Sequence, residues 1–153
     1  MPTRRDALSR GAHACTAAFA AAVLPLHVPT PADRQRFMLI GLTGPENPTR
    51  ASLLVAWANA LGEGGHDVRI ELAGEATLLM RAQVADSLLG VGVPAFRTMM
   101  AKVQAQGIPI YVCRPCAMAR GVSETDLAGN KAVFANAQAM AAAMAWATKV
   151  LVV

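Results

Sequence analysis

The stretch "RFMLIGLTGPENPTRASLLVAWANALGEGGHDVRIELAG", residues 36–74, decides the fold because it contains a complete strand–helix–strand pattern. An apolar run over residues 36–44 predicts a buried strand followed by a loop. Residues 45–65 predict a helix that Asn47 or Thr49 can cap and that glycines end. Residues 66–74 alternate apolar side chains with polar ones, which predicts a second strand.

The rest of the chain continues this alternation of strands and helices. The further predicted elements are a helix at 94–107, a strand at 108–113, a helix start at 123–127, a short strand at 131–134, a helix at 135–147 and a last strand at 149–153. Residues 75–93 fit a strand extension, a loop or a short helix equally well. The order predicts an α/β domain with a mainly parallel sheet of about five strands, covered on both faces.

The first 32 residues predict an export signal that is cleaved off, which leaves residues 33–153 as the domain. Arg4 and Arg5 resemble the pair of a twin-arginine signal, and no charged residue occurs between positions 11 and 32. We therefore expect a periplasmic protein that meets the membrane only during export. A disordered or mitochondrial-type leader is the alternative. A permanent anchor is disfavoured, because a span needs about 20 strongly apolar residues.

The charge of the chain excludes one class of partner. The formal net charge is +4, but three of the basic residues lie in the predicted signal, so the remaining domain is close to neutral. No basic stripe with interleaved aromatic residues is present, and we expect no nucleic-acid binding.

The stretch "IPIYVCRPCAMARG", residues 108–121, carries the most reactive side chains. Cys113 ends a predicted strand and Cys116 follows three residues later. Sites of open α/β sheets lie outside the carboxyl ends of the strands, so Cys113 falls on the expected edge. The loop at 41–50 follows the first strand and should share this edge. Its residues Glu46 and Asn47 either line the pocket or serve as turn and cap residues.

The two thiols allow several kinds of chemistry. Structural zinc needs four ligands, and residues 33–153 offer only Cys113, Cys116 and His66, so a zinc site within one chain is disfavoured and a site shared between subunits stays open. A redox pair is possible, since Arg114 and a helix starting at Pro115 would lower a thiol pKa.

Sulfur transfer is the third possibility. A thiolate near Arg114 and Arg120 can attack a sulfane sulfur and hold it as a persulfide. Two structural thiols in a buried turn remain the simplest alternative.

Four stretches resemble the DsrE/DsrF-like sulfur-relay family: "GLTGPENPTRASLLVAWANAL", "GGHDVRIELAGEATLL", "GIPIYVCRPCAMARGVSETDL" and the closing "KVLVV". The resemblance implies a flavodoxin-like three-layer sandwich that assembles as trimers or hexamers. It also implies a strand-end cysteine, here Cys113, that accepts and passes on sulfur, whereas many relatives lack a cysteine at the position of Cys116. Arg120 and Gly121 match an Ala-Arg-Gly segment of the family. An export signal departs from its cytoplasmic sulfur-oxidation members.

The leading hypothesis is an exported sulfur carrier or sulfurtransferase-like protein. Cys113 takes sulfane sulfur from a protein or a small sulfur compound, Arg114 stabilises the anion and Cys116 resolves the persulfide. The expected substrate-binding residues are Arg120, Asn47 and Glu46. We expect no cofactor and no metal within one chain. The alternatives are a non-catalytic thiol/disulfide or oligomeric binding module with a structural or redox Cys-x-x-Cys, and a metal or tetrapyrrole module built across an oligomer interface.

Overall fold

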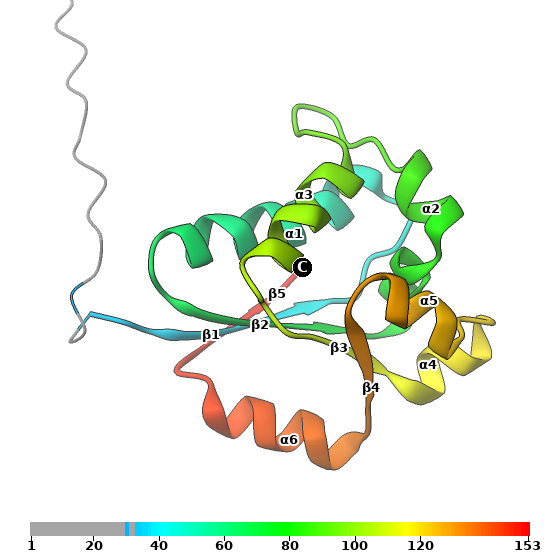
Figure 1. The fold of residues 1–153 in the computed structure, drawn as a ribbon. Coiled ribbons are helices and arrows are strands. Elements are labelled where there is room, and N and C mark those ends of the chain that lie inside the picture. The colour runs from blue at the N-terminus through cyan, green and yellow to red at the C-terminus, as the bar shows by residue number, and fades with distance from the viewer. Residues whose placement is uncertain (1–29, 31–32) are drawn as a thin grey trace, which may run out of the picture.

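In the part of the chain that the structure describes, five strands form one sheet in which every neighbouring pair is parallel, in the order β4-β3-β2-β1-β5 (Figure 1). The structure is a computed structural model that describes Thr30 and residues 33–153. The strands are β1 (Arg36–Gly41), β2 (Asp67–Leu72), β3 (Ile110–Cys113), β4 (Ala132–Ala135) and β5 (Lys149–Val152). The predicted α/β class and the parallel sheet of about five strands are confirmed.

Helices cover both faces of the sheet, which makes the molecule a three-layer sandwich. The helices are α1 (Pro48–Glu63), the 3-10 helix η1 (Gly74–Met80), α2 (Ala82–Ser87), α3 (Phe96–Ala105), α4 (Arg114–Ala119), α5 (Glu124–Gly129) and α6 (Ala137–Trp146). Helices α1 and α3 lie on one face and α6 lies on the other (Figure 1). The ambiguous stretch at 75–93 supplies most of η1 and all of α2.

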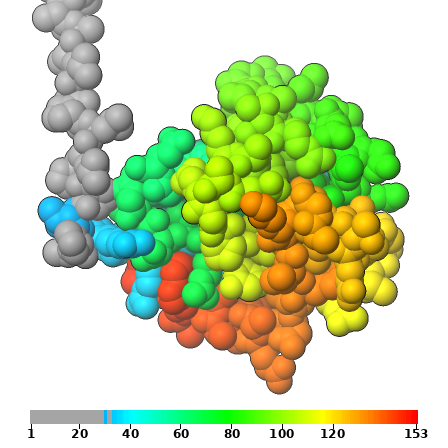
Figure 2. Space-filling model, viewed as in Figure 1, coloured from blue at the N-terminus to red at the C-terminus, as the bar shows by residue number. Residues whose placement is uncertain are grey.

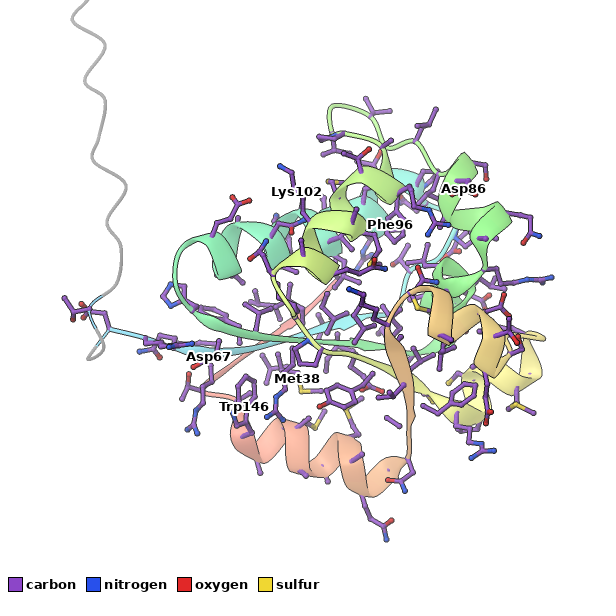
Figure 3. The ribbon with its side chains drawn as sticks, viewed as in Figure 1. Met38, Asp67, Asp86, Phe96, Lys102 and Trp146 are labelled. Atoms are coloured by element: carbon purple, nitrogen blue, oxygen red, sulfur yellow. The ribbon has the colours of Figure 1, made fainter. Side chains whose placement is uncertain are left out.

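The central strand β1 is apolar on both sides from Met38 onward, because both of its faces are buried there. In β1, Leu39 belongs to the large core under α1 and α3, while Met38 and Ile40 pack against Ala143 of α6. The stick view shows Met38 on the α6 side of the sheet and Phe96 within the opposite layer (Figure 3). A polar side chain on the α6 face of a central strand is therefore buried as well.

The predicted export signal, residues 1–32, lies outside the described residues except for Thr30. In the described part of the chain, no helix has both the length and the hydropathy needed to cross a bilayer. The export signal and the periplasmic location stay predictions.

Candidate functional site

The two thiols meet where β3 passes into α4. Cys113 is the last residue of β3 and the residue that precedes α4, and Cys116 lies in the first turn of that helix. Both cysteines are free and half-buried. The Cys113 thiol donates a hydrogen bond to Cys116 Sγ at 2.8 Å, whereas a disulfide bond measures about 2.05 Å. The two sulfur atoms are therefore in contact without being bonded, so a proton can pass between them.

The surroundings of Cys116 favour its thiolate. The hydrogen bond from Cys113 is the largest cause of its lowered pKa, followed by the backbone N–H of Gly74 and the charge of Arg120. Gly74 has φ +55°, a left-handed conformation that glycine adopts without strain. The turn between β2 and η1 thus supplies a backbone donor to the thiol pair.

Arg120 is held beside Cys116 by two contacts. One guanidinium nitrogen, Nη1, donates to the carbonyl oxygen of Cys116 at 3.0 Å, and Nη2 donates to Glu75 Oε1 at 2.5 Å. The ion pair and its hydrogen bond lower the pKa of Glu75. Arg120 therefore links α4 to η1 and keeps a positive charge next to Cys116, as expected from its place in the sequence.

Cys113 has a different environment. Burial is the largest cause of its raised pKa, and the hydrogen bond with Cys116 adds to the rise. Arg114, the expected cation, is exposed and its guanidinium lies over the ring of Phe134 at 5.5 Å. It lines a separate pocket of about 300 Å³ that contains neither thiol. The pKa of Cys113 is thus raised rather than lowered, and the cation next to the thiol pair is Arg120.

A small pocket of about 190 Å³ opens next to Cys113, at the ends of β2, β3 and β4 and the start of α6. Its lining residues are Glu71, Ala73, Cys113, Pro115, Ala135, Asn136, Ala137 and Met140. Glu71 is 2% exposed, and its Oε2 atom has no hydrogen-bond partner in the part of the chain that the structure describes. Burial raises the pKa of Glu71 to about 7.

Sequence reasoning missed Glu71 as a site residue. The residue occupies a polar position of an alternating strand, which is the usual pattern of a surface face. The signal that could have found it is the prediction that helices cover both faces of the sheet, because a carboxyl group on a central strand is then buried.

The loop at 41–50 lies on the same edge as the thiols, as expected. A Cβ atom on Gly44 would lie 2.4 Å from the carbonyl oxygen of Glu75, so the loop is pressed against η1. Glu46 Oε1 accepts a hydrogen bond from the Gly44 N–H at 2.8 Å, and Asn47 Oδ1 accepts one from the Arg50 N–H at 3.1 Å. Both side chains serve the turn and the cap of α1, and neither lines the pocket of Cys113.

Comparison of the sequence with known families decides its membership. The DsrE/DsrF-like family matches residues 35–153, which is most of the chain. The chain belongs to the DsrE/DsrF-like family.

Solved structures share the fold of this DsrE/DsrF-like protein. The ychN protein from E. coli is 20% identical, with a TM-score of 0.63 over 78% of this chain and 99% of that chain. A conserved protein of unknown function from Bacteroides thetaiotaomicron is 15% identical, with a TM-score of 0.59 over 78% of this chain and 95% of that chain. These likenesses concern the fold alone. Among curated proteins, none matches the sequence.

The described residues of this DsrE/DsrF-like domain contain no group of three or more His, Cys, Asp or Glu side chains that could hold a metal ion. His66 precedes β2 and lies at the opposite edge of the sheet from the thiols. Its Nδ1 atom accepts a hydrogen bond from the Gln35 N–H at 3.3 Å.

The structure thus brings together Cys113, Cys116 and Arg120 of the predicted site residues, and it adds Glu71 to them. Arg114, Glu46 and Asn47 make contacts elsewhere. The assembled group contains a thiol pair, a fixed cation and a buried carboxyl group. This arrangement suits nucleophilic thiol chemistry with local proton transfer.

Proposed function

We propose that this DsrE/DsrF-like protein is a sulfur carrier, which accepts sulfane sulfur as a persulfide on Cys113 and passes it on. The observation that carries the proposal is the position of Cys113, which lines a pocket and donates a hydrogen bond to a second thiol 2.8 Å away. Membership of the DsrE/DsrF-like family is consistent with a role in sulfur relay.

Loading begins when the proton of Cys113 passes to Cys116, its hydrogen-bond partner. The Cys113 thiolate attacks the sulfane sulfur of the donor, a new S–S bond forms on Cys113, and the donor's own S–S bond breaks. The backbone N–H of Gly74 and the charge of Arg120 favour the thiolate of Cys116 before transfer.

Delivery can follow two routes. In the first, the thiolate of an acceptor attacks the outer sulfur and leaves Cys113 as a thiolate, which needs no oxidant or reductant. In the second, Cys116 attacks the inner sulfur, hydrosulfide leaves, and a Cys113–Cys116 disulfide forms. A thiol reductant must then reopen that disulfide.

Intact-mass measurement tests the proposal. The reduced protein is incubated with polysulfide or thiosulfate and then separated from the donor. Its intact mass is measured without added reductant. We expect a gain of about 32 Da, one sulfur atom, in the wild type and none in Cys113→Ser. An equal gain in Cys113→Ser contradicts the assignment of the carrier to Cys113.

The close approach of the thiols also favours a second candidate, a redox or structural Cys-x-x-Cys module without sulfur transfer. The same experiment separates the two. A loss of about 2 Da with no sulfur gain means that Cys113 and Cys116 only close a disulfide. A very negative reduction potential would then assign a structural role.

We further propose that the protein acts in the periplasm as a homo-oligomer, a trimer or a hexamer. The sequence of residues 1–32 supports export. Exposed valines on the edge strand β5 support self-association. The sulfur donor and acceptor are a partner protein or a small sulfur compound.

A further inference from the structure

We propose that the pocket beside Cys113 binds a small, uncharged alkyl hydropersulfide as the sulfur donor, and that the Glu71 carboxyl group protonates the thiolate that leaves. This inference rests on the proposed function and specifies the donor and an additional catalytic residue.

Glu71 and Cys113 share the face of the sheet that α6 covers. In the register of the parallel strands, Glu71 pairs with Ile40 of β1 and with Tyr111 of β3. Ile40 packs on the α6 side, and Cys113 lies two residues after Tyr111, so Glu71 and Cys113 point to the same side. Both side chains line the pocket.

One oxygen atom of the buried Glu71 carboxyl group has no hydrogen-bond partner among the described residues. That atom is Oε2, and the residue is 2% exposed. An unsatisfied buried polar atom costs about 1–3 kcal/mol, so it is unusual in a native structure without a bound group. A ligand in the pocket that accepts or donates a proton would satisfy it.

The described residues provide no cation to this pocket. Arg69 precedes Glu71 on the same face of β2, but its guanidinium lies 3.9 Å from the ring centroid of Trp146. Arg114 lies over Phe134, and Arg120 is paired with Glu75. The titratable groups of β3 on this face are Cys113 and Tyr111. The environment thus keeps Glu71 protonated up to about pH 7, because burial is not offset by a positive charge.

The lining of the pocket selects the kind of donor. Apart from Glu71, Cys113 and Asn136, the lining residues are alanines, a proline and a methionine. An anion such as thiosulfate would enter without a counter-charge and would be repelled by ionised Glu71. A hydropersulfide, R–S–SH, is electrophilic as the neutral molecule and not as its anion. The volume of about 190 Å³ suits a donor of a few heavy atoms.

The proposed step balances without an added oxidant or reductant. The Cys113 thiolate, whose proton has moved to Cys116, donates an electron pair to the outer sulfur of R–S–SH. The S–S bond of the donor breaks, its electron pair stays on R–S⁻, and Glu71 gives its proton to that sulfur. The products are the Cys113 persulfide and R–SH, and ionised Glu71 recovers a proton from Cys116 or from water.

The test compares two donors whose leaving groups differ in their need for a proton. The reduced full chain is mixed with 2-hydroxyethyl hydropersulfide or with thiosulfate at pH 6.5, and the initial rate of sulfur gain on Cys113 is followed by intact mass. The wild type should load faster from the hydropersulfide. Glu71→Gln should slow that reaction about 100-fold, the range of general acid catalysis. With thiosulfate, Glu71→Gln should load at a rate within about threefold of the wild-type rate, since the leaving group, sulfite, needs no proton. The exposed Glu63→Gln is the matched control and should behave as the wild type.

Three outcomes would overturn the inference. Equal slowing with both donors in Glu71→Gln would assign Glu71 a structural role. No slowing with either donor would mean that Glu71 takes no part in the transfer of sulfur. Faster loading from thiosulfate in the wild type would contradict the choice of donor. These results leave the carrier role of Cys113 intact, whereas a wild type that gains no sulfur from either donor refutes the carrier role itself.

A second readout needs no turnover: the infrared band of a protonated carboxyl group should be present in the wild type at pH 6 and missing from Glu71→Gln.

Discussion

At the scale of single residues, Glu71 and Arg120 give the two thiols different electrostatic environments. Glu71 is buried, and burial favours its neutral form. Arg120 is fixed by Glu75 and by the carbonyl oxygen of Cys116, so it favours negative charge nearby. The two groups divide the site into an acidic, apolar pocket at Cys113 and a thiolate-stabilising side at Cys116.

The buried carboxyl group predicts a stability that depends on pH. The folded pKa of Glu71, about 7, lies above its ordinary value of 4.5. Its contribution to the free energy of unfolding is therefore complete below pH 4.5 and is lost as the pH rises through 7. The loss amounts to at most about 3 kcal/mol at 1.36 kcal/mol per pKa unit.

Urea unfolding of the reduced protein at pH 5 and pH 8 measures this effect. The wild type should lose more stability over this interval than Glu71→Gln, which carries no titrating group at this position. Glu63→Gln should follow the wild type. Parallel pH dependence in the wild type and Glu71→Gln would contradict the buried, protonated carboxyl group.

The position of Arg120 predicts which arginine activates a thiol. Arg120→Ala should raise the pKa of Cys116, because a nearby cation is lost, and should slow its alkylation several-fold at neutral pH. Arg114→Ala is the matched control and should leave the rate unchanged, since that guanidinium lies over Phe134. Alkylation by iodoacetamide, assigned to each cysteine by peptide mass, gives the rates. If Arg114→Ala slowed alkylation more than Arg120→Ala did, Arg114 would be the residue that stabilises the thiolate, as its place next to Cys113 in the sequence predicts.

At the scale of elements, short helices and tight turns place the reactive groups. Helix α4 begins at the predicted place but has six residues, so its dipole adds little to the thiol chemistry. The 3-10 helix η1 packs against α4 and brings Gly74 and Glu75 to the thiol pair. The site therefore depends on the contact between two short elements that follow neighbouring strands.

The cap of α1 allows a test of the two roles predicted for Asn47. Asn47→Ala removes the hydrogen bond to the Arg50 N–H and should lower the free energy of unfolding by about 1 kcal/mol. Asn47→Ser can still cap and should restore most of that stability. Sulfur loading of Cys113 should be equal in both variants if Asn47 only caps the helix. Loss of loading in both variants, with stability kept in Asn47→Ser, would support the predicted contact with substrate.

At the scale of the whole molecule, apolar side chains remain exposed on the edge strand β5 and on α6. On the edge strand β5, Val150 is 45% exposed and Val152 is 57% exposed. Met144 is also exposed on α6, and the space-filling view shows part of the red C-terminal segment beside α6 (Figure 2). Among the described residues β5 pairs only with β1, and such an edge strand with exposed apolar side chains favours association with another chain.

We predict that copies of the protein associate through the edge strand β5. Val152→Lys should shift the protein toward a smaller species in light scattering, because a charge would be buried at the contact. Val91→Lys is the control, since Val91 is 84% exposed in the loop before α3. A wild type that is monomeric at micromolar concentration, or an unchanged mass for Val152→Lys, would contradict association through this edge.

The sequence by itself determined the class of fold and the edge of the sheet that carries the thiols. Apolar periodicity, glycine stops and capping residues act within a few positions of one another, so local patterns were sufficient for the helix of residues 48–63 and the five strands. The same patterns placed Cys113 at the end of its strand. They left residues 75–93 open, because a 3-10 helix followed by one short α-helix has no clear period.

Only the tertiary structure decided which charged groups reach the thiols. Arg114 adjoins Cys113 in sequence but turns to Phe134, while Arg120 and the backbone of Gly74 come to Cys116. Glu71 has the sequence pattern of a surface residue, yet the covering by α6 buries it in the pocket of Cys113. The physical reason is that burial and charge pairing depend on contacts between elements far apart in the chain, which a local pattern does not contain.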